Sequence, residues 1–187
     1  MTAAITSGVL ALVLAAYGLV ARARIGRLRS AAAALNGTYA DATWLRPGRI
    51  VGPGFTVRIV KVRRSFLTYV DVRARDVPGA YVLNARFFEL WPDWDHVKVP
   101  QEVSQRAFFF NVRFPGYGPP DDRQRDALWR WLTRGATDRR LPFDLVSAAR
   151  ITSIVVGDGC VSTSFRGLVS DAGRLRRTID LLGRLAS

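Results

Sequence analysis

The stretch TAAITSGVLALVLAAYGLVA, residues 2–21, decides how this chain is arranged. It carries no charged side chain, and a helix of its twenty positions would be about 30 Å long, the thickness of the hydrocarbon core of a bilayer. Its eight branched aliphatic residues favour insertion by roughly −2 to −5 kcal/mol in total, against smaller polar penalties. We therefore predict a single transmembrane helix that contacts the lipid bilayer through residues 2–21.

Positive charge follows this apolar run directly. The flanking arginines are Arg22, Arg24, Arg27 and Arg29, and the first acidic residue is Asp41. Because cytoplasmic flanks of transmembrane helices carry an excess of arginine and lysine, we expect the rest of the chain on the cytoplasmic side of a bacterial-type inner membrane. The same arginines can contact anionic lipid headgroups.

Two alternatives to an anchor stay open. Ala21-Arg22-Ala23 has the small-x-small form of a signal-peptide cleavage site, which would make the remainder an exported cell-envelope domain. Against cleavage, no lysine or arginine precedes the apolar run, whereas a signal peptide begins with positive charge. A buried core helix would need a much larger partner domain to cover apolar residues on every side.

The pattern divides the chain into an anchor at 1–21, a basic juxtamembrane helix at 22–37 and a domain at 44–187. In the second segment Ile25, Leu28, Ala32 and Leu35 share one helix face, and Asn36-Gly37 is a typical helix stop. We expect this helix to continue the anchor or to bend onto the membrane surface.

The domain reads as α+β, with a mostly antiparallel sheet of about six strands and two or three helices packed on it. Alternating or apolar runs predict strands, Gly-Asp-Gly at 157–159 predicts a tight hairpin turn, and the stretch from Leu90 to Pro100 is interpreted as a loop. The predicted strands are 55–59, 66–72, 81–88, 107–114, 151–156 and 160–165, with a turn at 63–65 between the first two. The predicted helices are 121–134, with Trp131 in its buried stripe, 141–149, and one that begins near Ser170 or Asp171 and carries an apolar seam of Leu175, Ile179, Leu182 and Leu185.

Composition is consistent with one folded, basic domain. The 187 residues carry a net charge of +13, and all but two of the 28 basic residues are arginines. This basicity predicts attraction to anionic lipid or nucleic acid. A single cysteine, Cys160, excludes a disulfide within the chain and agrees with a reducing compartment.

The residues that enzymes use for chemistry are sparse. His96 is the one histidine, and with Asp93 and Asp95 it makes an incomplete metal shell that a polar loop explains equally well. The glycines at 52–54 and 157–159 lack the spacing of a phosphate-binding fingerprint. We predict no catalytic, cofactor or metal site, and we keep as an alternative an enzyme that uses a carboxylate such as Asp71 or Asp93.

The leading hypothesis is a non-enzymatic protein-interaction module held at the inner face of the membrane. The predicted interaction surface consists of Trp91, Trp94, Arg63 and Arg64, since tryptophan and arginine are enriched at interface anchors. The hairpin end with Arg58, Lys61, Arg63 and Arg64 beside Phe66 and Tyr69 could instead bind the phosphates and bases of nucleic acid. We expect a protein partner and not nucleic acid.

Overall fold

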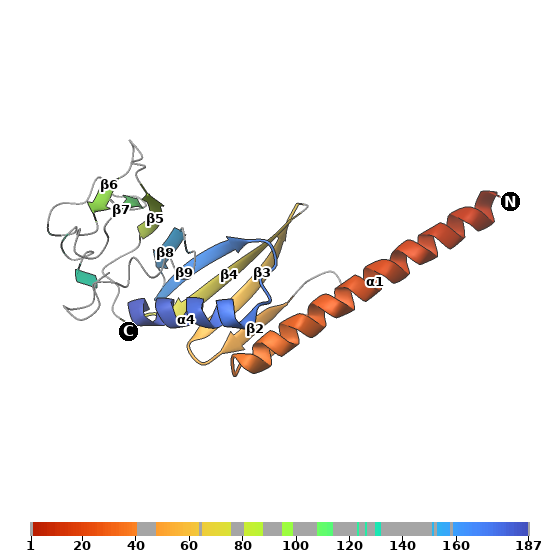
Figure 1. Ribbon diagram of the computed structural model, residues 1–187, viewed down its shortest axis with the longest axis horizontal. Helices are drawn as coiled ribbons and strands as arrows, with labels where there is room; N and C mark the ends of the chain where they lie inside the picture. Colours follow the sequence, from red (N-terminus) through yellow and green to blue (C-terminus); the bar gives the residue numbers. More distant parts are fainter. Residues whose placement is uncertain are drawn as a thin grey trace.

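A computed structural model describes the parts of the chain that are discussed below (Figure 1). These are residues 2–40, 48–63, 65–75, 81–87, 95–98, 108–113, 153–157 and 159–186, with the single residues Arg123, Asp126, Arg130, Trp131 and Ile151. Within them the chain is an α+β protein with a long N-terminal helix, an antiparallel sheet and a C-terminal helix.

Helix α1 runs without a break from Thr2 to Ala34, so the juxtamembrane helix continues the apolar segment. It ends as the sequence predicts. Asn36 has a positive φ of 54°, and the amides of Asn36 and Gly37 donate to the carbonyls of Ala33 and Ala32 at 3.1 and 2.9 Å. This pair of bonds is a Schellman motif, which satisfies carbonyls that the helix end leaves open.

Among the described residues, nine strands form one sheet in the order β1-β2-β3-β4-β9-β8-β5-β7-β6, and every neighbouring pair is antiparallel. The expected sheet of about six strands is present, and further strands extend it. The strands are β1 (Thr38–Ala40), β2 (Arg49–Gly52), β3 (Phe55–Val62), β4 (Ser65–Arg73), β5 (Tyr81–Phe87), β6 (Asp95–Lys98), β7 (Phe108–Arg113), β8 (Ser153–Gly157) and β9 (Cys160–Arg166).

Tight turns connect several neighbouring strands. Gly54, with a φ of 76°, follows Pro53 between β2 and β3, as a type II turn requires. Arg63, with a φ of 51°, lies in the two-residue turn between β3 and β4 that the sequence predicts. Gly159, with a φ of 67°, lies in the turn between β8 and β9. These turns set the register of the sheet.

Side chains on one face of the sheet form the core together with helix α4 (Ala172–Ala186). Strands β3, β4, β8 and β9 alternate between buried and more exposed residues, which is the pattern of a sheet covered on one side. In α4 the predicted seam of Leu175, Leu182 and Leu185 is fully buried, and Ile179 packs at its edge. Figure 1 shows α4 lying along the sheet, and the helix contacts β4 and β9.

The start of α4 also agrees with the sequence. The carboxylate of Asp171 accepts a hydrogen bond from the amide of Arg174 at 2.5 Å, so Asp171 is the N-cap. The guanidinium of Arg174 lies 4.4 Å from the centroid of the Phe165 ring, which holds the first turn of the helix against β9.

One loop prediction needs correction, two short strands were not predicted, and two helix predictions lie largely outside the described residues. The stretch from Leu90 to Pro100 is not all loop, because Asp95–Lys98 pairs with β7 as the edge strand β6. A four-residue edge strand is held by backbone hydrogen bonds, so it needs no alternation of apolar side chains that the sequence would reveal. Likewise β1 and β2 are too short for a periodic signal. The helix at 141–149 lies outside the described residues; of the helix at 121–134, Arg123, Asp126, Arg130 and Trp131 are helical, and Trp131 is buried as predicted.

Candidate functional site

Helix α1 changes character near Ala21. From Val9 to Val20 the large apolar side chains are exposed, for example Leu12 at 73% and Leu19 at 67%, and they lie on all sides of the helix. Ala21 is buried, and the last turns of the helix pack on the domain through Leu28, Ala31, Ala32 and Leu35. One helix thus has a section exposed to solvent and a section that is part of the fold.

The predicted membrane-flank arginines lie where this change occurs. Arg22, Arg27 and Arg29 are exposed, whereas Arg24 is partly buried. The Arg24 guanidinium lies 5.3 Å from the centroid of the Phe66 ring at the start of β4, a cation–π contact between α1 and the β3–β4 hairpin. The flank is therefore in contact with the domain through one of its four arginines.

A second contact joins the N-terminal helix α1 to the C-terminal helix α4. The guanidinium of Arg176 in α4 donates a hydrogen bond to the backbone carbonyl of Ala34, the last residue of α1. A cation at a helix C-terminus interacts favourably with the negative end of the helix dipole. Tyr39 of β1 is partly buried, and this burial raises its pKa above the ordinary value, while the charges of Arg24 and Arg29 act in the opposite direction.

The sheet face opposite α4 carries charged and polar side chains. Its central feature is an ion pair between neighbouring strands, in which Arg58 Nε lies 2.7 Å from Asp71 Oδ2. The hydrogen bond to Asp71 raises the pKa of Arg58, and partial burial acts in the opposite direction. The Arg58 guanidinium also lies 5.4 Å from the centroid of the Tyr69 ring. Arg49 is the register neighbour of Arg58 on β2.

This face is hollowed beside the ion pair. A depression of about 460 Å³ is lined by Arg49, Thr56, Arg58, Asp71, Val155, Gly157, Cys160 and Ser162. A second depression of about 660 Å³ lies at the end of the strands, around Arg73, Arg75 and Cys160. Asp71 is the one acid that lines either depression, so the described lining is cationic overall.

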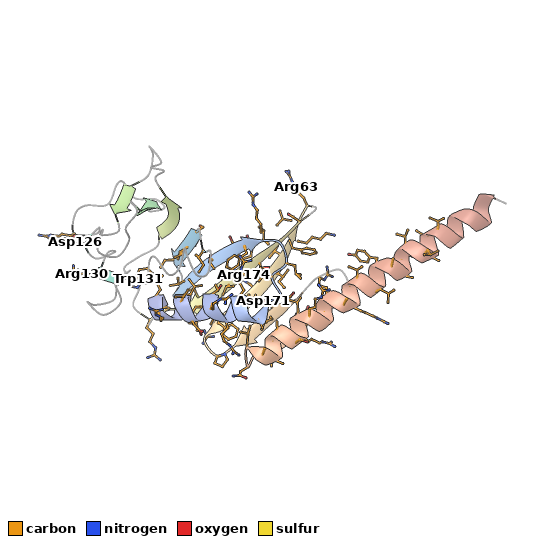
Figure 2. The ribbon with its side chains drawn as sticks, viewed as in Figure 1. Arg63, Asp126, Arg130, Trp131, Asp171 and Arg174 are labelled. Atoms are coloured by element: carbon orange, nitrogen blue, oxygen red, sulfur yellow. The ribbon has the colours of Figure 1, made fainter. Side chains whose placement is uncertain are left out.

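The described part of the predicted interaction surface is separate from this hollow. Arg63 is exposed at the end of the β3–β4 hairpin, as Figure 2 shows, whereas Arg64, Trp91 and Trp94 lie outside the described residues. Asp93 also lies outside them, and the backbone of Asp95 and His96 belongs to β6. Among the side chains that are described, no three of His, Cys, Asp and Glu gather as a metal-binding group.

Sequence reasoning missed the hollow face. Its residues come from β2, β3, β4, β8 and β9, so their proximity depends on strand order and register. The available signal was alternation: Thr56 and Arg58 interleave with the buried Phe55, Val57 and Ile59. That pattern places both residues on the open face and does not reveal that Asp71 lies opposite them.

Comparison of the chain with known protein families, with characterised proteins and with solved structures finds no match.

Proposed function

We propose that this chain is a single-pass membrane protein whose α+β domain is held at the cytoplasmic face of the inner membrane as a non-enzymatic protein-interaction module. The observation that carries the membrane part is the exposure of the large apolar side chains on all sides of α1 between Val9 and Val20. By length and composition α1 is a helix that could span a bilayer over Gly8–Ala34, with the domain packed only at its C-terminal end. A helix with apolar side chains on every side is stable in the hydrocarbon core of a lipid bilayer.

The orientation follows from charge. The four flank arginines stand at the domain side of the apolar section, and positive charge of this kind is retained in the cytoplasm. Burial of Ala21 and the contact of Arg24 with Phe66 support a folded domain directly next to that end of the proposed span.

Membrane insertion and orientation can be tested together. A reporter enzyme active only outside the cytoplasm, fused to the C-terminus, should give low activity in cells while the chain resists alkaline extraction from membranes. Leu12→Asp is a sharp control, because a carboxylate at the span centre costs roughly 2.5–3.5 kcal/mol, comparable to the whole insertion free energy. This variant should appear in the soluble fraction. High reporter activity, or alkaline release of the unmodified chain, would refute the proposal.

For the interaction part, the hollow sheet face is the surface that the described residues favour. It combines a half-exposed Arg58, aligned by Asp71 and Tyr69, with apolar and hydroxyl neighbours such as Val155 and Ser162. Aligned arginines beside an aromatic ring are typical of interface anchors, and the cationic lining suits an acidic protein surface.

A photo-activated cross-linking amino acid at Ser162, on the hollow face, tests this surface in intact cells. The matched control carries it at Arg177, which is exposed on α4. We expect a discrete adduct from position 162 that Arg58→Ala weakens, and none from position 177. Equal labelling at both positions, or an adduct that is insensitive to Arg58→Ala, would contradict an interaction through this face.

A further inference from the structure

The end of the β3–β4 hairpin lies beside the boundary between the exposed and the packed section of α1. Phe66, the second residue of β4, contacts Arg24, which is one helical turn from Ala21. The turn at Arg63 lies beyond Phe66 on the hairpin. Figure 1 shows the hairpin end and the N-terminal half of α1 projecting from the same side of the domain, and Figure 2 labels Arg63 at the extremity of the hairpin.

The exposed side chains of this hairpin end alternate between apolar and basic. Val60 and Val62 are each 40% exposed, and Lys61 and Arg63 are exposed between and beyond them. From Phe55 to Val70 the sequence contains no acidic residue. Apolar side chains beside basic ones are the composition of segments that lie in the headgroup layer of an anionic membrane.

The packing of the domain on α1 keeps the hairpin end beside the boundary between the exposed and the packed section of the helix. α1 has no interruption between the apolar section and Ala34, so no flexible linker separates the anchor from the domain. Its last turns are held by the buried Leu28 and by the Arg176 hydrogen bond to Ala34. If residues 2–21 span the bilayer, Arg22 and Arg24 lie in the headgroup layer, and the contact of Arg24 with Phe66 brings the hairpin end to the same layer.

We infer that the end of the β3–β4 hairpin is a second membrane contact, in which Lys61 and Arg63 bind anionic phospholipid headgroups and Val62 enters the interfacial layer. The inference rests on the proposed membrane anchoring and adds to it that the domain lies on the bilayer at a fixed face, with two points of attachment.

The test measures depth with an environment-sensitive fluorophore on a single cysteine in the full chain, with Cys160→Ser as background. The chain is reconstituted in nanodiscs that contain anionic phosphatidylglycerol or only zwitterionic phosphatidylcholine, with lipids that carry a quencher near the headgroup. Val62→Cys reports the hairpin end. Val155→Cys is the matched control, since Val155 is 46% exposed on the hollow face. Leu12→Cys reports the anchor, with lipids quenched at the acyl chain.

We expect strong quenching at position 62 in anionic discs, weaker quenching in zwitterionic discs, and little at position 155 in either. Replacing both Lys61 and Arg63 by Gln should lower the ratio of docked to undocked hairpin by about 30-fold. This value follows because each basic residue near the surface contributes about 1 kcal/mol, and 1.4 kcal/mol changes an equilibrium tenfold. Quenching at position 12 without quenching at position 62 would overturn the hairpin contact and leave the anchor standing. Absence of quenching at position 12 would refute the anchor itself.

Discussion

The hydroxyl of Thr68 joins β4 to the segment between β9 and α4, and its removal should weaken the fold measurably. Thr68 is fully buried on the core side of the sheet. Its Oγ1 donates to the carbonyl of Gly167 at 2.8 Å and accepts from the amide of Val169 at 3.0 Å. The proposed perturbation is Thr68→Val, which keeps the shape of the side chain and removes both bonds.

The magnitude follows from the two partners. The Val169 amide is buried, and a buried donor left without a partner costs about 1–3 kcal/mol. Gly167 is only partly buried, so water can replace part of its lost bond, while the added methyl group recovers some free energy by burial. We therefore expect Thr68→Val to lower the free energy of unfolding by about 2 kcal/mol, or the melting temperature by about 4–8 °C for a domain of this size.

The assay is urea unfolding of the full chain in detergent micelles, followed by near-ultraviolet circular dichroism, which reports the packed domain and not the micelle-bound helix. Thr56→Val is the matched control, because Thr56 lies on the hollow face of the neighbouring strand and should change stability by no more than about 0.5 kcal/mol. If Thr68→Val is as mild as Thr56→Val, the reasoning that this hydroxyl holds β4 to the β9–α4 segment is wrong.

Two further predictions concern the core and the region around α1. Leu182→Ala should lower the free energy of unfolding by about 2–5 kcal/mol in the same urea assay, because Leu182 is fully buried, whereas Arg177→Ala on the exposed side of α4 should leave it within about 0.5 kcal/mol. Since burial raises the pKa of Tyr39, the unfolded chain loses the phenolic proton first, so the free energy of unfolding should fall as pH rises past the ordinary tyrosine pKa of 10.0. In Tyr39→Phe this alkaline decline should be shallower, and a decline as steep as that of the unmodified chain would contradict the prediction.

Much of this fold could be predicted from the sequence, because the signals were local. The alternation through β3, β4, β8 and β9, the stop at Asn36-Gly37 and the leucine seam of α4 each depend on neighbours in the chain, and each is confirmed. Strands β1, β2 and β6 were not foreseen because they have only three or four residues, too few for a period, and are held by backbone pairing to a neighbour.

The candidate sites were less accessible to sequence reasoning. Arg58 and Asp71 are separated by 13 residues, Arg176 and Ala34 by 142, and only the tertiary structure brings either pair together. The four arginines after the apolar run could be named from the sequence, because charge asymmetry is a local feature, and their role as a membrane flank stays a prediction. The contact of Arg24 with Phe66 could not, because it depends on where the β3–β4 hairpin lies relative to α1.

The hydrogen bond from Arg176 to Ala34 has a consequence for biosynthesis. Ala34 and Arg176 are separated by 142 positions, so the ribosome delivers α1 with its local Asn36-Gly37 stop long before the arginine that binds its last carbonyl. The central pairing of β4 with β9 likewise waits for the final third of the chain. A partly translated chain that ends before residue 172 would lack α4, so Ala31, Ala32 and Leu35 would be without the leucines of α4 that share their buried cluster, and such an intermediate would be prone to aggregation.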